Sequence, residues 1–291
     1  MENFLILLMN GLFAATFPLG KHALEYTGPL FLTAVRMLLA GILLLTYSYV
    51  KDKKIVVKKQ DWPFFIKTSF FYVFLSFVPE FWALHYLSSI KTNLLWSVQP
   101  FLAAIIGCVF FSETLSTKKL SALCIGFAGM LPIIFTADHT GSNQLLSISL
   151  PELSLLVAVI STIYAWHLLK QLLVRGYSLP LVNGITMTIG GLSCLLTALG
   201  EQCYYQQDLY SNFAAVLGYS ALLVLISNVA AYGIYGYLLN RYSITFLSFT
   251  GFTCPLFGFV YSYWVGEVIP VAYLYGCALI IVGLYLFYQQ E

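Results

Sequence analysis

Charged side chains are scarce in this sequence: of its 291 residues, 9% are Asp, Glu, Lys or Arg, whereas 60% are hydrophobic. A soluble globular domain carries roughly 25% charged residues. A chain so poor in charge cannot cover a surface that faces water, so lipid must be its main solvent. It also has no long polar segment, which excludes a nucleic-acid-binding domain and a separate soluble catalytic domain.

The sequence also lacks the patterns that mark disulfides, metals and enzyme sites. Five of its six cysteines fall inside apolar runs, so we interpret them as small hydrophobic residues. The segment Gly20-Lys21-His22 is not a phosphate-binding loop, because the upstream glycine is missing and a histidine replaces the Ser or Thr. No nucleophile elbow or cluster of metal ligands occurs in the sequence. We therefore expect no enzyme activity, no catalytic residues, no metal and no cofactor.

What the sequence does contain is a series of apolar segments, and about 20 such residues suffice to cross a bilayer. Ten segments are expected, at residues 3–20, 28–50, 62–86, 92–112, 119–136, 151–173, 180–199, 213–238, 244–265 and 270–288. We interpret the first as a membrane helix rather than a signal peptide, because no basic residue precedes it and many apolar segments follow. The sequence thus predicts an all-α membrane protein with ten transmembrane helices.

The distribution of Lys and Arg predicts how the chain is oriented, because cytoplasmic loops are enriched in these residues. With the N-terminus in the cytoplasm, the cytoplasmic loops hold Lys51, Lys53, Lys54, Lys58, Lys59, Lys67, Lys118, Lys119, Lys170, Arg175 and Arg241. The two longest outer loops, at 137–150 and 200–212, hold no Lys or Arg. The outer loops hold only Lys21 and Lys91, and Lys21, at the outer end of the first helix, argues the other way. We expect a multi-pass protein of a bacterial-type inner membrane with both termini in the cytoplasm.

Five helices in each half is an odd number, so the second half must enter the membrane upside down, as in many transporters. The sequence supports such a duplication. Pro100 precedes Glu113, and Pro255 precedes Glu267, at nearly equal spacing late in each half, and small residues follow both acids at the same offsets. The predicted inverted five-helix repeats span residues 1–137 and 151–288.

These features together resemble the EamA type of drug/metabolite transporter. The resemblance covers nearly the whole chain and rests on Arg36 early in the second helix, Pro100 in the fourth, Glu113 after it, and the pair Pro255 and Glu267 in the second half. The second half has no matching arginine. The resemblance implies secondary transport of a small organic compound by alternating access. It also implies a site between the halves, lined by helices one, three, four, six, eight and nine.

Two charged residues inside the predicted helices are candidates for function, because ionisable groups are costly within a bilayer. At a rise of about 1.5 Å per residue, Arg36 lies about 12 Å and Glu80 about 9–12 Å from the outer surface. They can form a structural ion pair, or Glu80 can face the cavity and bind a cationic group or a proton. Pro79 favours the second hypothesis, because a proline opens the helix locally.

Polar and aromatic residues share one face of the fourth helix and one face of the eighth, at helical spacing. The predicted substrate-binding residues, beside Glu80, are Asn93, Trp96, Ser97, Asn228, Tyr232 and Tyr235, with Phe249 and Thr250 of the ninth helix. A structural interpretation also exists, since Asn can bond helices together and Trp and Tyr form belts at membrane surfaces. The occurrence of such stripes in both halves favours a cavity.

These observations predict a monomeric transporter, held in the lipid bilayer, that moves a small organic metabolite and uses protons or a counter-substrate. A single acid in an aromatic setting favours cations. The favoured substrates are amino acids, amines and cationic amino-acid derivatives such as S-adenosylmethionine. If Arg36 neutralises Glu80, a neutral or anionic metabolite or drug is the alternative. A membrane-embedded enzyme and a non-transporting scaffold are the remaining alternatives.

Overall fold

The computed structural model of the protein describes residues 2–52, 56–111, 149–205 and 212–265, with the positions 116–117, 120–122, 124–125, 127–128, 275, 278–279, 281–282 and 285–286. These residues form helices and turns, and no strand occurs among them. Six of the described segments are long and apolar enough to cross a membrane. Most of the predicted fifth and tenth helices, and both Glu113 and Glu267, lie outside the described residues, so the count of ten stays a prediction.

Four of these six segments are continuous α-helices. They are α1 (Glu2–Ala23), α2 (Pro29–Asp52), α8 (Leu150–Val174) and α9 (Leu179–Tyr205). The start of α8 is a capping box, in which the backbone N–H of Ser149 donates to Glu152 at 2.6 Å. Its end is set by Gly176, whose φ of 92° is the left-handed conformation that glycine adopts without strain.

The remaining spans are interrupted near their middle. The third consists of η1 (Lys59–Asp61), α3 (Trp62–Ser69), the π-helix η2 (Phe70–Phe74) and α4 (Leu75–Tyr86). The eighth consists of α10 (Phe213–Leu223), the π-helix η3 (Val224–Ala231) and α11 (Tyr232–Leu239). The fourth comprises α5 (Ser89–Trp96) and α6 (Gln99–Phe111), and the ninth comprises α12 (Ile244–Thr250), the 3₁₀ turn η4 (Gly251–Thr253) and α13 (Cys254–Val265). The spans thus break at corresponding places in the two halves.

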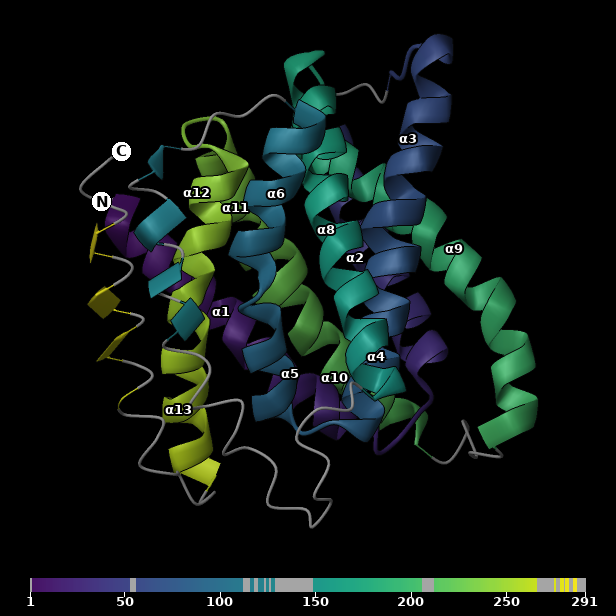
Figure 1. The fold of residues 1–291 in the computed structure, drawn as a ribbon. Coiled ribbons are helices and arrows are strands. Elements are labelled where there is room, and N and C mark those ends of the chain that lie inside the picture. The colour runs from purple at the N-terminus through teal and green to yellow at the C-terminus, as the bar shows by residue number, and fades with distance from the viewer. Residues whose placement is uncertain are drawn as a thin grey trace.

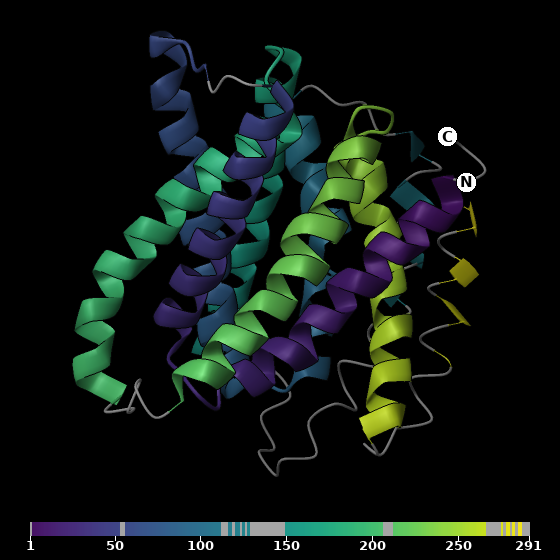
Figure 2. The same cartoon turned by 180° about the vertical axis from the view of Figure 1, so that it is seen from behind.

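The helices pack in pairs that correspond between the halves (Figures 1 and 2). The first span packs on the eighth and on α13, α8 packs on the third span and on α6, and α2 packs on α9. Exchanging the halves leaves this set of contacts unchanged, as inverted repeats require. The α2–α9 contact is close: a Cβ added to Gly41 would lie 2.3 Å from Thr188 Oγ1. Small residues allow such approach between membrane helices.

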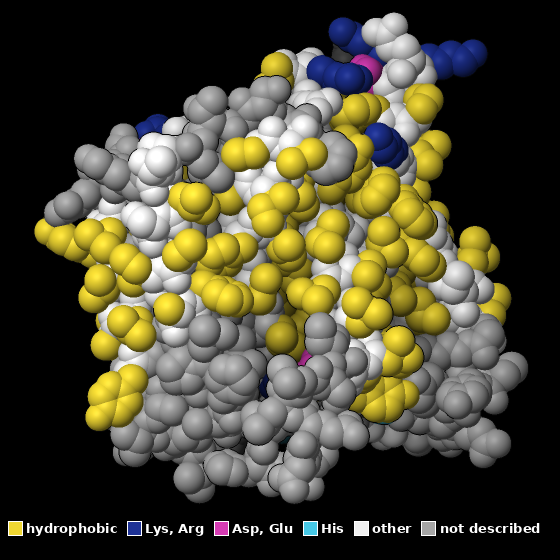
Figure 3. All heavy atoms as spheres, viewed as in Figure 1, with side chains coloured by type: hydrophobic (Ala, Val, Ile, Leu, Met, Phe, Trp, Pro, Cys, Tyr) yellow, Lys and Arg dark blue, Asp and Glu magenta, His cyan; other side chains and the backbone are white. Residues whose placement is uncertain are grey.

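Hydrophobic side chains cover the side of the bundle, and Lys and Arg side chains gather at the end drawn at the top of Figure 3. Leu196, for example, is 72% exposed and Val109 is 68% exposed. The end where α1 begins, here called the amino-terminal face, carries Glu2, Asp61, Arg175 and Arg241. The other end, here called the opposite face, carries Lys21, Lys91 and Glu152. An apolar side surface around membrane-length helices makes this a multi-pass membrane protein.

Candidate functional site

A cavity lies between the middle parts of seven spans: the first four, the sixth, the eighth and the ninth. It encloses about 710 Å³ of space between atoms, its opening included. The wall therefore comes from the six helices that the family resemblance implies, with Arg36 of α2 in addition.

Arg36 is held by the eighth span. It is 1% exposed, and its Nε donates to Asn228 Oδ1 at 2.8 Å while its Nη2 donates to Ser227 Oγ at 2.8 Å. Its guanidinium also lies 4.9 Å from the centre of the Phe77 ring, a cation–π contact. Both partners lie in the π-helix η3. The arginine thus ties α2 to the interrupted part of the eighth span.

Glu80 lines the cavity from α4 without a direct ion pair among the described residues. Its side chain is buried, with 8% of the residue exposed. Within the described residues its carboxylate has no ion pair and no hydrogen bond, and its separation from Arg36 exceeds ion-pair distance. The structure therefore does not contain the direct pair that is one of the two sequence hypotheses.

Hydroxyl groups of α8 support the interrupted third span beside Glu80. A proline at position 79 and the π-helix η2 both disturb the regular backbone hydrogen bonds of that span. Ser154 Oγ donates to Pro79 O at 3.1 Å, and Ser161 Oγ donates to Phe71 O at 2.7 Å. These bonds satisfy carbonyl groups that a bilayer would leave without partners.

Aromatic rings make up much of the cavity wall. The Tyr232 ring is the centre of a cluster in which the centroids of Phe13, Tyr72 and Phe77 lie 5.2, 5.5 and 6.4 Å away. These contacts are edge-to-face, the arrangement that aromatic quadrupoles favour. The cavity is thus an apolar, polarisable chamber with few charges.

Three buried polar atoms on cavity-lining residues have no hydrogen-bond partner in the described part of the chain: Trp96 Nε1, Trp166 Nε1 and Asn93 Oδ1. The amide nitrogen of Asn93 donates to Cys254 O at 3.3 Å. Buried polar atoms are nearly always hydrogen-bonded in folded proteins. Two indole donors, one amide acceptor and the Glu80 carboxylate are thus available to a polar ligand.

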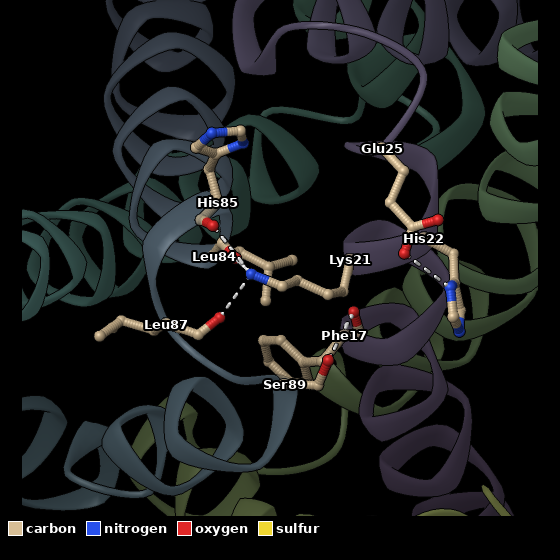
Figure 4. Close-up of polar contacts among 8 residues, drawn as sticks. All are labelled: Phe17, Lys21, His22, Glu25, Leu84, His85, Leu87 and Ser89. Carbon is tan, nitrogen blue, oxygen red and sulfur yellow. Dashed lines mark hydrogen bonds and ion pairs between the residues drawn. The ribbon is translucent and has the colours of Figure 1, made fainter. Parts of the chain in front are cut away.

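Contacts between spans join the helices at the opposite face. Lys91 at the start of the fourth span forms a salt bridge of 2.9 Å with Glu152 at the start of α8. Figure 4 shows a second contact, in which Lys21 Nζ donates to the carbonyl oxygens of Leu84, His85 and Leu87 at 2.8, 2.8 and 2.9 Å. The end of a helix leaves such carbonyl groups unpaired. Lys21 therefore caps α4 and fastens α1 to it.

A corresponding pair joins the spans at the amino-terminal face. Arg241, in the loop between the eighth and ninth spans, forms an ion pair with Glu2 at the start of α1, and Tyr242 donates to the same carboxylate at 2.6 Å. The two pairs correspond. In each, an acid (Glu2 or Glu152) starts the first helix of one half, and its basic partner (Arg241 or Lys91) lies near the connection between the third and fourth helices of the other half.

Comparison with known proteins identifies the family. Residues 1–135 match the EamA-like transporter family. Over 100% of its length the chain is 30% identical to the S-adenosylmethionine/S-adenosylhomocysteine transporter of Chlamydia muridarum (strain MoPn / Nigg), of which it covers 92%. The chain belongs to the EamA-like transporter family. The family resemblance is thereby confirmed, and the protein is a membrane transporter of small molecules.

Two further comparisons agree with this family. The S-adenosylmethionine/S-adenosylhomocysteine transporter of Chlamydia trachomatis serovar L2 (strain ATCC VR-902B / DSM 19102 / 434/Bu) is 30% identical over 100% of this chain and 90% of its own. A solved crystal structure aligns with 98% of this transporter and 99% of its own chain, with a TM-score of 0.67 and 17% identity. At that identity the crystal structure supports the fold alone.

Most of the predicted site residues of the transporter line one cavity. The structure brings together Arg36, Glu80, Asn93, Trp96, Ser97, Tyr232 and Tyr235. Three others are not among the residues that line this cavity. Asn228 is bound to Arg36, the backbone and hydroxyl oxygens of Thr250 accept from Asn10 Nδ2 at 2.9 and 3.2 Å, and Phe249 packs on Phe252 with a centroid distance of 5.1 Å. We expect these three to position others rather than to touch substrate.

Sequence reasoning missed several residues of the wall. They are chiefly Asn10 and Phe13 of α1, Gln99 of α6, Trp166 of α8 and Ser248 of α12. Asn10 and Gln99 are uncharged polar residues inside predicted membrane helices, and this signal alone could have found them. Trp166 carries no such signal, because tryptophan is common in membrane proteins for other reasons.

Proposed function

We propose that this protein is a secondary transporter that exchanges S-adenosylmethionine for S-adenosylhomocysteine across a bacterial inner membrane. The observation that carries the proposal is a carboxylate, Glu80, that lines an aromatic cavity and forms no direct ion pair among the described residues. A fixed negative charge in such a chamber attracts a cation of the substrate. The full-length relatives, named for transport of this pair of compounds, support the choice.

The chemistry of S-adenosylmethionine fits this wall. Its sulfonium group carries a permanent positive charge that a carboxylate and aromatic faces stabilise. Its amino-acid end and its adenosine carry several hydrogen-bonding groups. The free indole N–H groups of Trp96 and Trp166 and the free amide oxygen of Asn93 are partners for such groups. A simple apolar drug would leave all of them unpaired, which is costly for buried polar atoms.

The ion pairs at the two faces support alternating access. The Lys91–Glu152 pair joins spans at one face and the Glu2–Arg241 pair joins spans at the other, with the cavity between the same spans. In our proposal one pair opens while the other stays closed, and the two inverted repeats exchange roles in the cycle. The amino-terminal face is the cytoplasmic one, because the described loops there carry more Lys and Arg than those at the opposite face. The working unit is a monomer with its own cavity.

We propose transport rather than catalysis. An enzyme site would need converging acid, base or nucleophilic groups. In the described wall the charged residues are Arg36 and Glu80, and the Nε and Nη2 donors of Arg36 are engaged by the eighth span. That leaves one carboxylate, which suffices to bind a cation and does not form a catalytic pair.

Exchange in proteoliposomes tests the proposal. Purified protein is reconstituted into vesicles loaded with unlabelled S-adenosylhomocysteine, and uptake of labelled S-adenosylmethionine is followed. We expect uptake that depends on the internal load and that excess external S-adenosylhomocysteine inhibits. Protein-free vesicles control for leakage, and methionine or adenosine inside the vesicles controls for the choice of counter-substrate. Correctly incorporated, folded protein that gives no more uptake than empty vesicles would refute the proposal.

A further inference from the structure

The two ends of the cavity differ in chemistry, and hydrogen bonds of α8 show how far apart they are. Ser154 Oγ donates to Pro79 O, so this part of α8 lies beside Glu80. Trp166 lies twelve residues farther along α8, which corresponds to about 18 Å along its axis. Because α8 and the third span run in opposite directions and helical side chains lean toward the start of their helix, both side chains lean toward one another. The space between them suits an elongated molecule.

The end nearer the opposite face offers negative charge and acceptors. Glu80 lies six residues before the end of α4, and Asn93 lies four residues after the start of α5, so both are at similar depth. The carboxylate of Glu80 has no partner in the described chain, and the amide oxygen of Asn93 is buried and unpartnered. Phe77, one helical turn from Glu80, adds an aromatic ring to the same wall, and the Arg36 guanidinium lies 4.9 Å from the centre of that ring. This end, called here the cation end, holds the negative charge of the described wall.

The end nearer the amino-terminal face offers aromatic rings and amide groups. The rings of Trp166 and Tyr235 lie 4.1 Å apart between centroids, and the indole Nε1 of Trp166 is buried without a partner. Gln99 Nε2 donates to Ser248 Oγ at 3.5 Å, and both line the cavity. Ser248 and Tyr235 each lie four residues from the end of their helix at this face. Aromatic rings that stack and amides that pair with base edges are how proteins bind nucleobases.

We infer that the transporter holds its substrate in one orientation, with the adenine against Trp166 and the sulfonium at Glu80. This inference rests on the proposed function and assigns its two kinds of specificity to different residues. Trp166 selects the adenosyl group, which both exchanged compounds carry. Glu80 distinguishes the sulfonium compound from its uncharged thioether product. The substrate class is thus an adenosyl amino acid, and neither a free amino acid nor a free nucleoside satisfies both ends.

The test compares compounds that carry one or both ends. Inhibition of exchange is measured for S-adenosylmethionine, S-adenosylhomocysteine, adenosine, which has only the base, and S-methylmethionine, which has only the sulfonium. The variants are Trp166→Leu, Trp166→Phe and Glu80→Gln. Trp82→Leu is the matched control, because Trp82 belongs to the same helix as Glu80 but contacts Tyr86, outside the cavity wall.

In Trp166→Leu we expect inhibition by all three adenosyl compounds to weaken roughly tenfold, the effect of losing one stacked base. Inhibition by S-methylmethionine should stay unchanged. Trp166→Phe keeps an aromatic ring and loses the N–H. Its inhibition by the adenosyl compounds should therefore lie between that of the wild type and that of Trp166→Leu. In Glu80→Gln the preference for S-adenosylmethionine over S-adenosylhomocysteine should shrink while inhibition by adenosine is kept. Equal losses for S-methylmethionine and adenosine in Trp166→Leu, or an unchanged preference in Glu80→Gln, would overturn the inference.

Thermal shifts of the detergent-solubilised protein separate this inference from the proposed function. If the wild type does not exchange S-adenosylmethionine, the proposed function fails. The inference is then decided by binding alone. The inference is supported if adenosine protects the wild type and Trp82→Leu against thermal unfolding but does not protect Trp166→Phe or Trp166→Leu. It is overturned if no adenosyl compound protects the wild type.

Discussion

Replacing Asn228 with alanine tests which residue holds the charge of Arg36. The structure predicts that Asn228→Ala destabilises the protein, because Arg36 Nε loses its 2.8 Å bond inside the bundle. Hydrogen bonds to charged groups contribute about 1.5–3 kcal/mol. Glu80→Gln should instead cost less than about 1 kcal/mol, since no direct ion pair is broken. Had the two charges been paired, the same change would cost about 3–5 kcal/mol.

The assay is a thermodynamic cycle read by unfolding in detergent or lipid. Arg36→Met removes the charge together with its desolvation cost, so Asn228→Ala should cost less in that background than in the wild type. Couplings across membrane helices average about 0.6 kcal/mol and reach about 1.7 kcal/mol. We expect the upper part of that range for Arg36 with Asn228 and a value near zero for Arg36 with Glu80. A Glu80 coupling as large as that of Asn228 would refute the reasoning.

Three further predictions follow from the fold and the site. A C-terminal fluorescent-protein fusion should be bright and a C-terminal alkaline phosphatase fusion inactive, because the Lys and Arg distribution places the terminus in the cytoplasm; the reverse result would invert the topology. Trp96→Ala and Tyr232→Ala should reduce substrate affinity more than protein yield, since both line the cavity; collapse of yield with normal transport in the remaining protein would make them packing residues. Lys91→Glu should repel Glu152 and open the opposite face, so a cysteine introduced in the cavity should react faster with an external thiol reagent. Exchanging the charges of residues 91 and 152 should restore the slow reaction. An unchanged reaction rate in Lys91→Glu would show that the pair does not control access.

Helical spacing in the sequence was sufficient to predict which residues share a face when they lie on one regular helix. Trp96 and Ser97 lie at the end of the fourth-span segment that begins with α5, and Tyr232 and Tyr235 share α11, so local geometry alone placed each pair. Helical spacing did not predict the direction of a side chain that lies within a π-helix. Asn228 lies in η3, whose wider turn changes the direction of the side chains relative to those that follow. Asn228 therefore faces Arg36 while the two tyrosines face the cavity.

Contacts between distant segments could not be predicted from the sequence. Arg36 and Asn228 are 192 residues apart, and depth in the membrane does not define the direction in which a side chain points around its helix. The Trp166–Tyr235 contact likewise depends on how α8 packs against the eighth span. Charge, hydropathy and spacing indicate which helices cross the membrane and which faces are polar, and packing decides which of those faces meet.

The charge inside the cavity has a consequence for how the membrane voltage acts on the proposed exchange. Arg36 and Glu80 line the cavity together and their formal charges cancel, so in that exchange the sulfonium compound enters with its own positive charge and the thioether leaves without one. Each exchange then carries one elementary charge inward. At 100 mV, negative inside, this is worth about 2.3 kcal/mol, a factor of about 50 in the accumulation ratio. The electrical gradient would thus drive uptake of the charged compound without any coupled ion.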